Sequence, residues 1–270
     1  SNSETNGWSD PLTIVMLVVS AVLIAAFVVI QRRVAHPLLP MRVVLDRNRG
    51  GSYLAFGIVS IGMFGVFLFL TYYMQRTLDF SPVQTGLAFL AMNFAIMASI
   101  GVCSQLLLPR FGPRPLISGG MALAAVAMII FAQLETTSGY VTGVLPGLLV
   151  MGIGMGGVFS AAMASATLGV DPHDAGVASA MVNTTQQVGG SIGTALLSTL
   201  FASAVTSYST NNADRFQGAQ LALESTMHGY VTAFWIASGI LAFGAVVTGL
   251  LLRPGAAPAM DPSAEPVMAH

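Results

Sequence analysis

Three amide side chains occur within five residues of an otherwise apolar part of the chain: Asn183, Gln186 and Gln187. Gly190 and Thr194 follow at spacings of three and four residues, so a helix would carry all five on one polar stripe. Amides donate and accept hydrogen bonds but are not nucleophiles. The stripe therefore predicts either reversible binding in a wet cavity or hydrogen bonding between helices, and both interpretations stay open.

Two further side chains are candidates for lining such a cavity. Asn93 is an isolated amide, which we interpret chiefly as a hydrogen-bond partner for another helix. Phe64 begins an aromatic run that could line a hydrophobic binding site. An interfacial aromatic belt explains the end of that run as well, and we favour the belt for Tyr72 and Tyr73. The run consists of Phe64, Phe67, Phe69, Tyr72 and Tyr73.

The chain lacks the usual signs of catalysis. Cys103 is its single cysteine, which excludes an intrachain disulfide. All four histidines lie outside the apolar stretches, and Ser160 follows no nucleophile signature. There is no lysine for the Schiff base of a retinal protein. We therefore expect no enzymatic activity, no metal and no cofactor.

Two small-residue patterns predict close helix packing. Gly152, Gly156 and Ser160 recur every four residues, and Gly189 and Gly193 form a GxxxG pair. Such patterns let helix backbones approach in a membrane, where apolar burial gives no driving force for packing. Alternatively, the glycines could let a helix bend or slide during a conformational cycle.

Seven stretches without Asp, Glu, Arg or Lys must position these residues. Each is long enough to cross a bilayer as a helix, and a charge at mid-membrane costs at least about 2.5–3.5 kcal/mol. The chain is 54% hydrophobic and only 8% charged, and its net charge of −1 argues against nucleic-acid binding. We predict an all-α polytopic membrane protein with seven transmembrane helices. They span 11–31, 53–75, 83–109, 115–134, 140–170, 175–213 and 229–252.

The arginines predict the orientation. Eight of the ten lie in loops that share one side if the amino end is outside, which makes that side cytoplasmic. Residues 1–10 are then an extracytoplasmic segment, 32–52 a cytoplasmic loop and 253–270 a disordered cytoplasmic tail. The six helices of 53–252 divide into two sets of three, as in an inverted repeat. Asp171, Pro172 and Asp174 fit N-cap, N1 and N3 of the sixth segment.

Four motifs, in this order, resemble a known family. The first is His36–Arg42, and the second joins Tyr72–Gln75 to Phe80–Pro82. The third is Pro109–Arg114, and the fourth runs from Asp174 through Asn183 to Gly190. Together they resemble the carboxyl-terminal half of a major facilitator superfamily transporter, in the fourteen-helix drug:proton antiporter group (EmrB/QacA type).

The resemblance carries several implications. Residues 11–31 would be a linker helix before a six-helix bundle, and Arg110, Gly112 and Arg114 would belong to the cytoplasmic loop motif. The function implied is proton-coupled multidrug efflux by alternating access. Its partners would be membrane lipid, protons, a hydrophobic or amphipathic small molecule, and a missing amino-terminal half with the proton-coupling acids. The chain would then be a piece of a longer protein.

Two departures weaken parts of this comparison. Pro109 stands where the fuller loop motif has an acid, and Gln186 stands where many members have a basic residue. Two alternatives also remain: a non-catalytic polytopic assembly subunit, or a superfamily exporter of a lipid or secreted metabolite.

Overall fold

The computed structural model describes residues 11–34, 46–167 and 174–253, and these are helical almost throughout. Within these ranges seven helices are long and apolar enough to cross a membrane. The predicted all-α polytopic fold is confirmed. The segments 1–10, 35–45, 168–173 and 254–270 lie outside the described residues, and so do the predicted tail and most of the predicted loop at 32–52.

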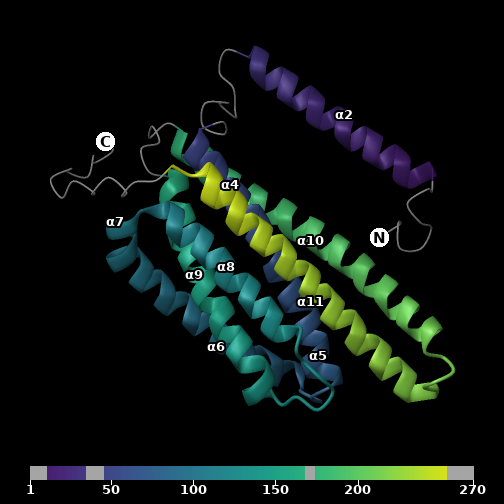
Figure 1. Cartoon of the computed structure of the whole chain (residues 1–270). Helices are drawn as coiled ribbons and strands as arrows, with labels where there is room; N and C mark the ends of the chain where they lie inside the picture. The colour runs from purple at the N-terminus through teal and green to yellow at the C-terminus, as the bar shows by residue number, and fades with distance from the viewer. Residues whose placement is uncertain (1–10, 35–45, 168–173, 254–270) are drawn as a thin grey trace.

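One helix stands before a bundle of six spanning segments. It is α2 (Pro11–Arg33), and it lies apart from the bundle (Figure 1). Two of the six spans contain a π-helical turn between α-helical parts, and a third begins with one. In chain order the spans are α4 (Arg47–Gly65), η1 (Val66–Leu70) and α5 (Thr71–Arg76); α6 (Pro82–Val102), η2 (Cys103–Leu107) and α7 (Leu108–Phe111); α8 (Pro113–Phe131); η3 (Tyr140–Val144) and α9 (Leu145–Thr167); α10 (Ala175–Asn211); and α11 (Gly218–Leu251).

The clearest differences from the predicted helix ends occur at three helix starts. α4 begins at Arg47, inside the expected loop 32–52, because the Asp46 side chain accepts hydrogen bonds from the backbone N–H groups of Asn48 and Arg49. α11 begins at Gly218 rather than 229. α10 has Asp174 at its N-cap rather than at N3, and residues 171 and 172 lie outside the described part.

The two last helices are longer than a bilayer requires. α10 has 37 residues and α11 has 34, or about 55 and 51 Å at 1.5 Å per residue. A hydrocarbon core is about 30 Å thick. The first turns of α11 can therefore carry Glu224 and His228 without placing either group at mid-membrane.

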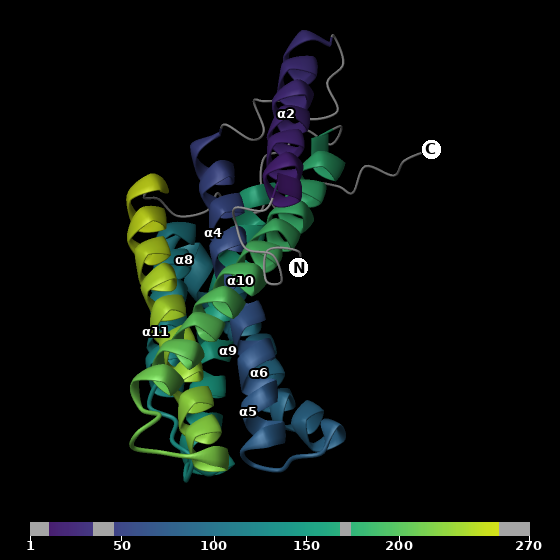
Figure 2. The same cartoon turned by 90° about the vertical axis from the view of Figure 1, so that its right-hand side faces the viewer.

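The packing of the six spans has a paired pattern. α9 packs mainly on α8 and α6, and α4 packs mainly on α10, while α11 contacts α8, α10 and α4. Figures 1 and 2 show α10 and α11 side by side along one flank, with α6, α8 and α9 grouped on the other. If α4, α6 and α8 form one set and α9, α10 and α11 the other, then in each set the first helix packs on the middle helix of the other set: α4 on α10, and α9 on α6. This pairing is what an inverted repeat of three plus three helices would produce.

The first and last spans meet at one end of the bundle. Arg47 of α4 donates hydrogen bonds to the carbonyl oxygens of Leu250 and Leu251, and Arg114 of α8 donates to that of Gly249. The backbone N–H of Arg253 donates to Oδ1 of Asn48 at 3.0 Å. The carbonyls of a final helical turn lack intrahelical partners and carry partial negative charge. Guanidinium groups from two other helices thus cap α11.

Candidate functional site

The site is built on the contact between α4 and α10. A Cβ added at Gly189 would overlap the backbone of Gly57, and one added at Gly193 would lie 2.6 Å from Cα of Ile61. Both glycines therefore bring the two backbones together, as small residues do between membrane helices. This contact fixes which sides of α10 remain open.

One open side forms a polar cavity of about 390 Å³ between α4 and α10. Phe64 forms its aromatic wall and is 45% exposed. The ring reaches this position because residue 190 has no side chain: a Cβ at Gly190 would lie 2.5 Å from it. The other lining residues, all on α10, are Gln187, Gly190, Ser191, Thr194, Ala195 and Ser198.

The cavity offers hydrogen-bonding groups along its α10 wall. The hydroxyl of Ser191 donates to the carbonyl of Gln187 at 2.8 Å, and that of Thr194 donates to the carbonyl of Gly190 at 2.9 Å. Their oxygen lone pairs therefore remain free to accept. The amide of Gln187 is exposed and forms no hydrogen bond with any described residue. A small molecule bound in this cavity would meet the free amide of Gln187 and the phenyl ring of Phe64. It could also donate hydrogen bonds to the hydroxyl oxygens of Ser191 and Thr194.

The opposite flank of the same contact is apolar. A cavity of about 450 Å³ lies there between α4 and α10, with Ile58 and Ile61 on one wall and Val188 and Ile192 on the other. Val188 and Ile192 are each about half exposed, at 52%. The two open flanks of α10 therefore differ in chemistry: one is almost entirely apolar, and the other presents an amide and hydroxyl groups beside apolar surface.

The predicted stripe and the isolated amide are only partly brought together. Gln187, Gly190 and Thr194 share the polar cavity with Phe64. Asn183 is exposed one turn away, and its Nδ2 donates to the carbonyl of Ser179 at 3.3 Å. Gln186 is half-buried outside the lining, and Asn93 lies exposed on α6, away from this cavity.

Phe67, Phe69 and Tyr73 of the aromatic run pack inside the bundle. Phe67 lies 4.8 Å from Phe89, and Phe69 stacks on Phe201 at 5.2 Å between ring centroids. Tyr73 is fully buried, so the interpretation of Tyr73 as part of an interfacial belt was wrong. Its hydroxyl instead binds the loop after α8. Tyr72 is 41% exposed beneath the guanidinium of Arg76.

The glycines of α9 lie on two faces. Cβ atoms at Gly152 and Gly156 would lie 2.6 and 2.5 Å from those of Ala95 and Ser99 on α6. One at Gly154 would lie 2.5 Å from the Gly120 carbonyl oxygen on α8. α9 thus touches two neighbours closely, not one. Ser160 has a buried Oγ without a hydrogen-bond partner among the described residues.

The loop motif joins α7 to α8. Gly112 has φ 76°, a left-handed conformation that favours glycine, and it ends one helix while beginning the next. Arg114 reaches α11, as described above, whereas Arg110 is exposed. The sequence motif groups Arg110 with Arg114. Of these two, only Arg114 donates a hydrogen bond to the end of another helix in the described structure.

Comparison with known proteins agrees with this architecture. Residues 8–194 match the family model of the Major Facilitator Superfamily. The chain is 43% identical to the puromycin resistance protein pur8 of Streptomyces alboniger, over 92% of this chain and 49% of that protein. It is 32% identical to a multidrug resistance protein B homolog of Mycobacterium tuberculosis, over 74% of this chain and 37% of the relative. It is 33% identical to the cephamycin export protein CmcT of Amycolatopsis lactamdurans, over 74% and 41%. The chain therefore spans about half, or less, of the length of these curated relatives.

Proposed function

This chain belongs to the major facilitator superfamily, and we propose that it is the carboxyl-terminal part of a proton-coupled drug exporter that works by alternating access. The relatives named for puromycin resistance and multidrug resistance support a drug as the substrate class. Because the chain spans about half of the first of them, an amino-terminal half would complete the transporter.

The observation that carries the proposal is the polar flank of α10. An exposed amide without a hydrogen-bond partner inside a membrane-spanning helix, as at Gln187, would be costly against lipid tails, which cannot hydrogen-bond. We infer that this flank faces the other half of the transporter across a water-accessible path. Phe64 beside it adds a surface for an aromatic or otherwise apolar part of the substrate.

Proton coupling needs a group that titrates in the transport path. The charge-free stretches contain no carboxylate, and Glu224 lies in the first turns of α11. We therefore assign the coupling acid to the amino-terminal half. In proteoliposomes of the complete protein, an inward pH gradient should drive export and a protonophore should abolish it. Export that is insensitive to the gradient would remove the proton from the proposal.

A second candidate substrate class is a secreted metabolite, which the cephamycin export relative favours. The same cavity would serve, because a free amide, hydroxyl acceptors and a phenyl face suit many amphipathic molecules. Drug and metabolite export are separated by assaying both classes of compound in one strain. The assembly-subunit alternative has no support from the relatives named above.

The test of the cavity is Gln187→Leu in the complete protein. Loss of an amide that binds substrate should change export of individual compounds by about 5–30-fold, equivalent to about 1–2 kcal/mol, while protein level stays near normal. Puromycin, ethidium and a neutral dye are suitable compounds. Gln186→Leu is the matched control, since Gln186 is half-buried outside the cavity. It should affect protein level more than selectivity. If Gln187→Leu lowers export of all compounds in proportion to protein level, Gln187 is structural and the cavity is not the substrate site.

A further inference from the structure

The ring of Phe64 lies directly against the backbone of α10 at Gly190. A Cβ atom at position 190 would lie 2.5 Å from Cε2 of this ring, 2.7 Å from Cδ2 and 2.9 Å from Cζ. Non-bonded carbon atoms normally stay about 3.5–4.0 Å apart. One side of the ring therefore occupies the space that a side chain at residue 190 would need, and any residue other than glycine would displace the ring.

Gly190 differs in this respect from the neighbouring glycines Gly189 and Gly193. A Cβ atom at either of these would meet backbone atoms of α4, at Gly57 and Ile61. Helix backbone can yield only if the whole helix moves, whereas a side chain can rotate to another rotamer. Substitution at 189 or 193 must therefore separate α4 from α10. Substitution at 190 need only turn one ring.

The open space beside this ring is the cavity of about 390 Å³ that Phe64 lines. The backbone that carries the ring is held in place. A Cβ atom at Gly65 would lie 2.6 Å from Cδ1 of Leu197 on α10, and Val66 is fully buried. The side chain of Phe64 is therefore the part that can move, and its position sets how much of the cavity is free.

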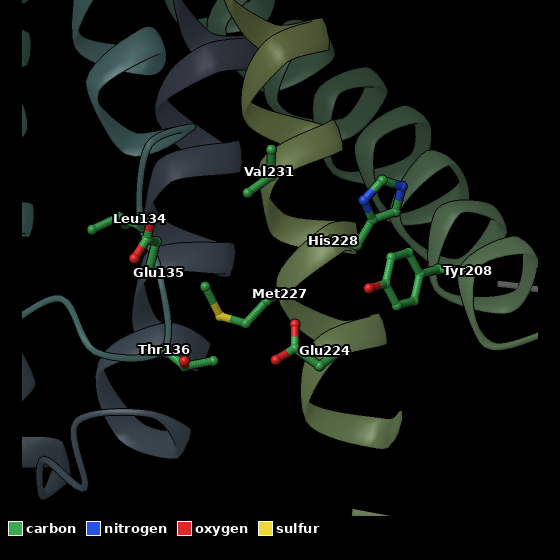
Figure 3. A pocket seen from close by; sticks show the side chains of 8 residues that line it. All are labelled: Leu134, Glu135, Thr136, Tyr208, Glu224, Met227, His228 and Val231. Carbon is green, nitrogen blue, oxygen red and sulfur yellow. The ribbon is translucent and has the colours of Figure 1, made fainter. Parts of the chain in front are cut away.

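The described lining of this cavity includes no charged side chain. The pocket between the loop after α8 and the first turns of α11 differs, because Glu135 and Glu224 stand on two of its walls (Figure 3). Discrimination beside Phe64 must therefore depend on shape, ring contact and hydrogen bonds. Aromatic groups pair in offset-stacked or edge-to-face arrangements. An aromatic group of a bound molecule would meet the exposed side of Phe64, wherever that ring lies.

We propose that Phe64 and Gly190 together limit the size of the aromatic group that this transporter accepts. Glycine at 190 keeps the ring of Phe64 against α10, which leaves the cavity wide enough for a fused-ring group. Gln187, Ser191 and Thr194 would bind the polar part of the same molecule. Gly190 is thus a positioning residue that acts through the ring. The inference rests on the proposed export function, because it assigns selectivity to the same cavity.

The test uses the acetylalanine amides of aniline, 2-naphthylamine and 2-aminoanthracene. They share one neutral polar part and differ only in the size of the aromatic group. Calorimetry on the complete protein, purified in detergent, gives their dissociation constants. Gly190→Ala should raise the ratio of the anthracene to the aniline constant about tenfold, because the displaced Phe64 ring takes the space of the larger group. In a Phe64→Ala background, Gly190→Ala should change this ratio less than about twofold, since there is no ring to displace.

Gly189→Ala is the matched control, since it adds the same methyl group one residue away but against backbone. It should lower the midpoint of thermal unfolding and weaken binding of all three amides alike, with or without the ring of Phe64. Gly190→Ala should shift the midpoint less. A midpoint as low as that of Gly189→Ala would show that the ring cannot turn, and would overturn the inference.

Three binding results would also overturn it: no binding of any amide, an equal loss for all three in Gly190→Ala, or the same change of ratio with and without Phe64. Export of puromycin by the wild-type protein in proteoliposomes is measured separately. Export with unchanged amide ratios would remove only the size limit. The expected ratios without export of any drug would instead contradict the proposed function.

Discussion

Nε of Arg114 donates a hydrogen bond to the carbonyl oxygen of Gly249, 135 residues later in the chain, at 2.6 Å. The bond joins the first turn of α8 to the last turn of α11. Hydrogen bonds that involve a charged group contribute about 1.5–3 kcal/mol, more than neutral ones. It therefore gives one arginine of the loop motif a structural role.

We predict that Arg114→Met lowers the free energy of unfolding by about 1–3 kcal/mol, because the α11 carbonyl loses its charged donor. Arg110→Met is the matched control. Arg110 belongs to the same motif but is exposed, so its loss should stay within about 0.5 kcal/mol. Thermal unfolding of the two purified variants in one detergent would compare them. Equal midpoints would contradict a role for the bond to Gly249.

A second prediction concerns the contact of α4 with α10. Gly189→Ala should destabilise the protein by about 1–3 kcal/mol, because the new methyl group would overlap the backbone of Gly57. Gly176→Ala on the same helix meets nothing within 4 Å. It should be neutral or slightly stabilising, since alanine favours helix by up to about 1 kcal/mol. Gly189→Ala should lower the midpoint of thermal unfolding, whereas Gly176→Ala should leave it unchanged or raise it. If both substitutions shift the midpoint in the same direction by the same amount, the contact between α4 and α10 is loose.

Orientation in the membrane supplies a third prediction. Thr137→Cys should react with an impermeant thiol reagent added outside intact cells, whereas Arg110→Cys should react only after permeabilisation. Both positions are exposed and lie at opposite ends of the bundle, and the native Cys103 is buried. The expectation follows from the excess of arginine at the Arg110 end. External labelling of Arg110→Cys would reverse the assigned topology.

Much of this fold could be predicted because a bilayer forbids charge. The charge-free stretches located all seven spanning helices, and the GxxxG spacing pointed to the face of α10 that meets α4. Helix ends were less predictable, since they depend on local capping and on how far a helix protrudes. Arg47 and Arg49 suggested a loop, yet Asp46 caps a helix that contains both. Glu224 also suggested a loop, yet it lies in the first turns of α11.

The site was harder to predict than the fold. Periodicity placed Asn183, Gln186 and Gln187 on one stripe, but it could not say which neighbour covers each one. The contact at Gly189 and Gly193 turns Gln187 into the cavity and leaves Gln186 half-buried beside it. Phe64 enters the cavity only because position 190 is a glycine.

The hydrogen bond between the backbone of Arg253 and Asn48 has a mechanical consequence. It places the first turn of α4 and a residue just after α11 at a single corner of the six-span unit, although 205 positions separate Asn48 from Arg253 in the chain. The unit is therefore closed on itself at this corner. Its first and last helices cannot move apart there without breaking this bond and those of Arg47 to Leu250 and Leu251.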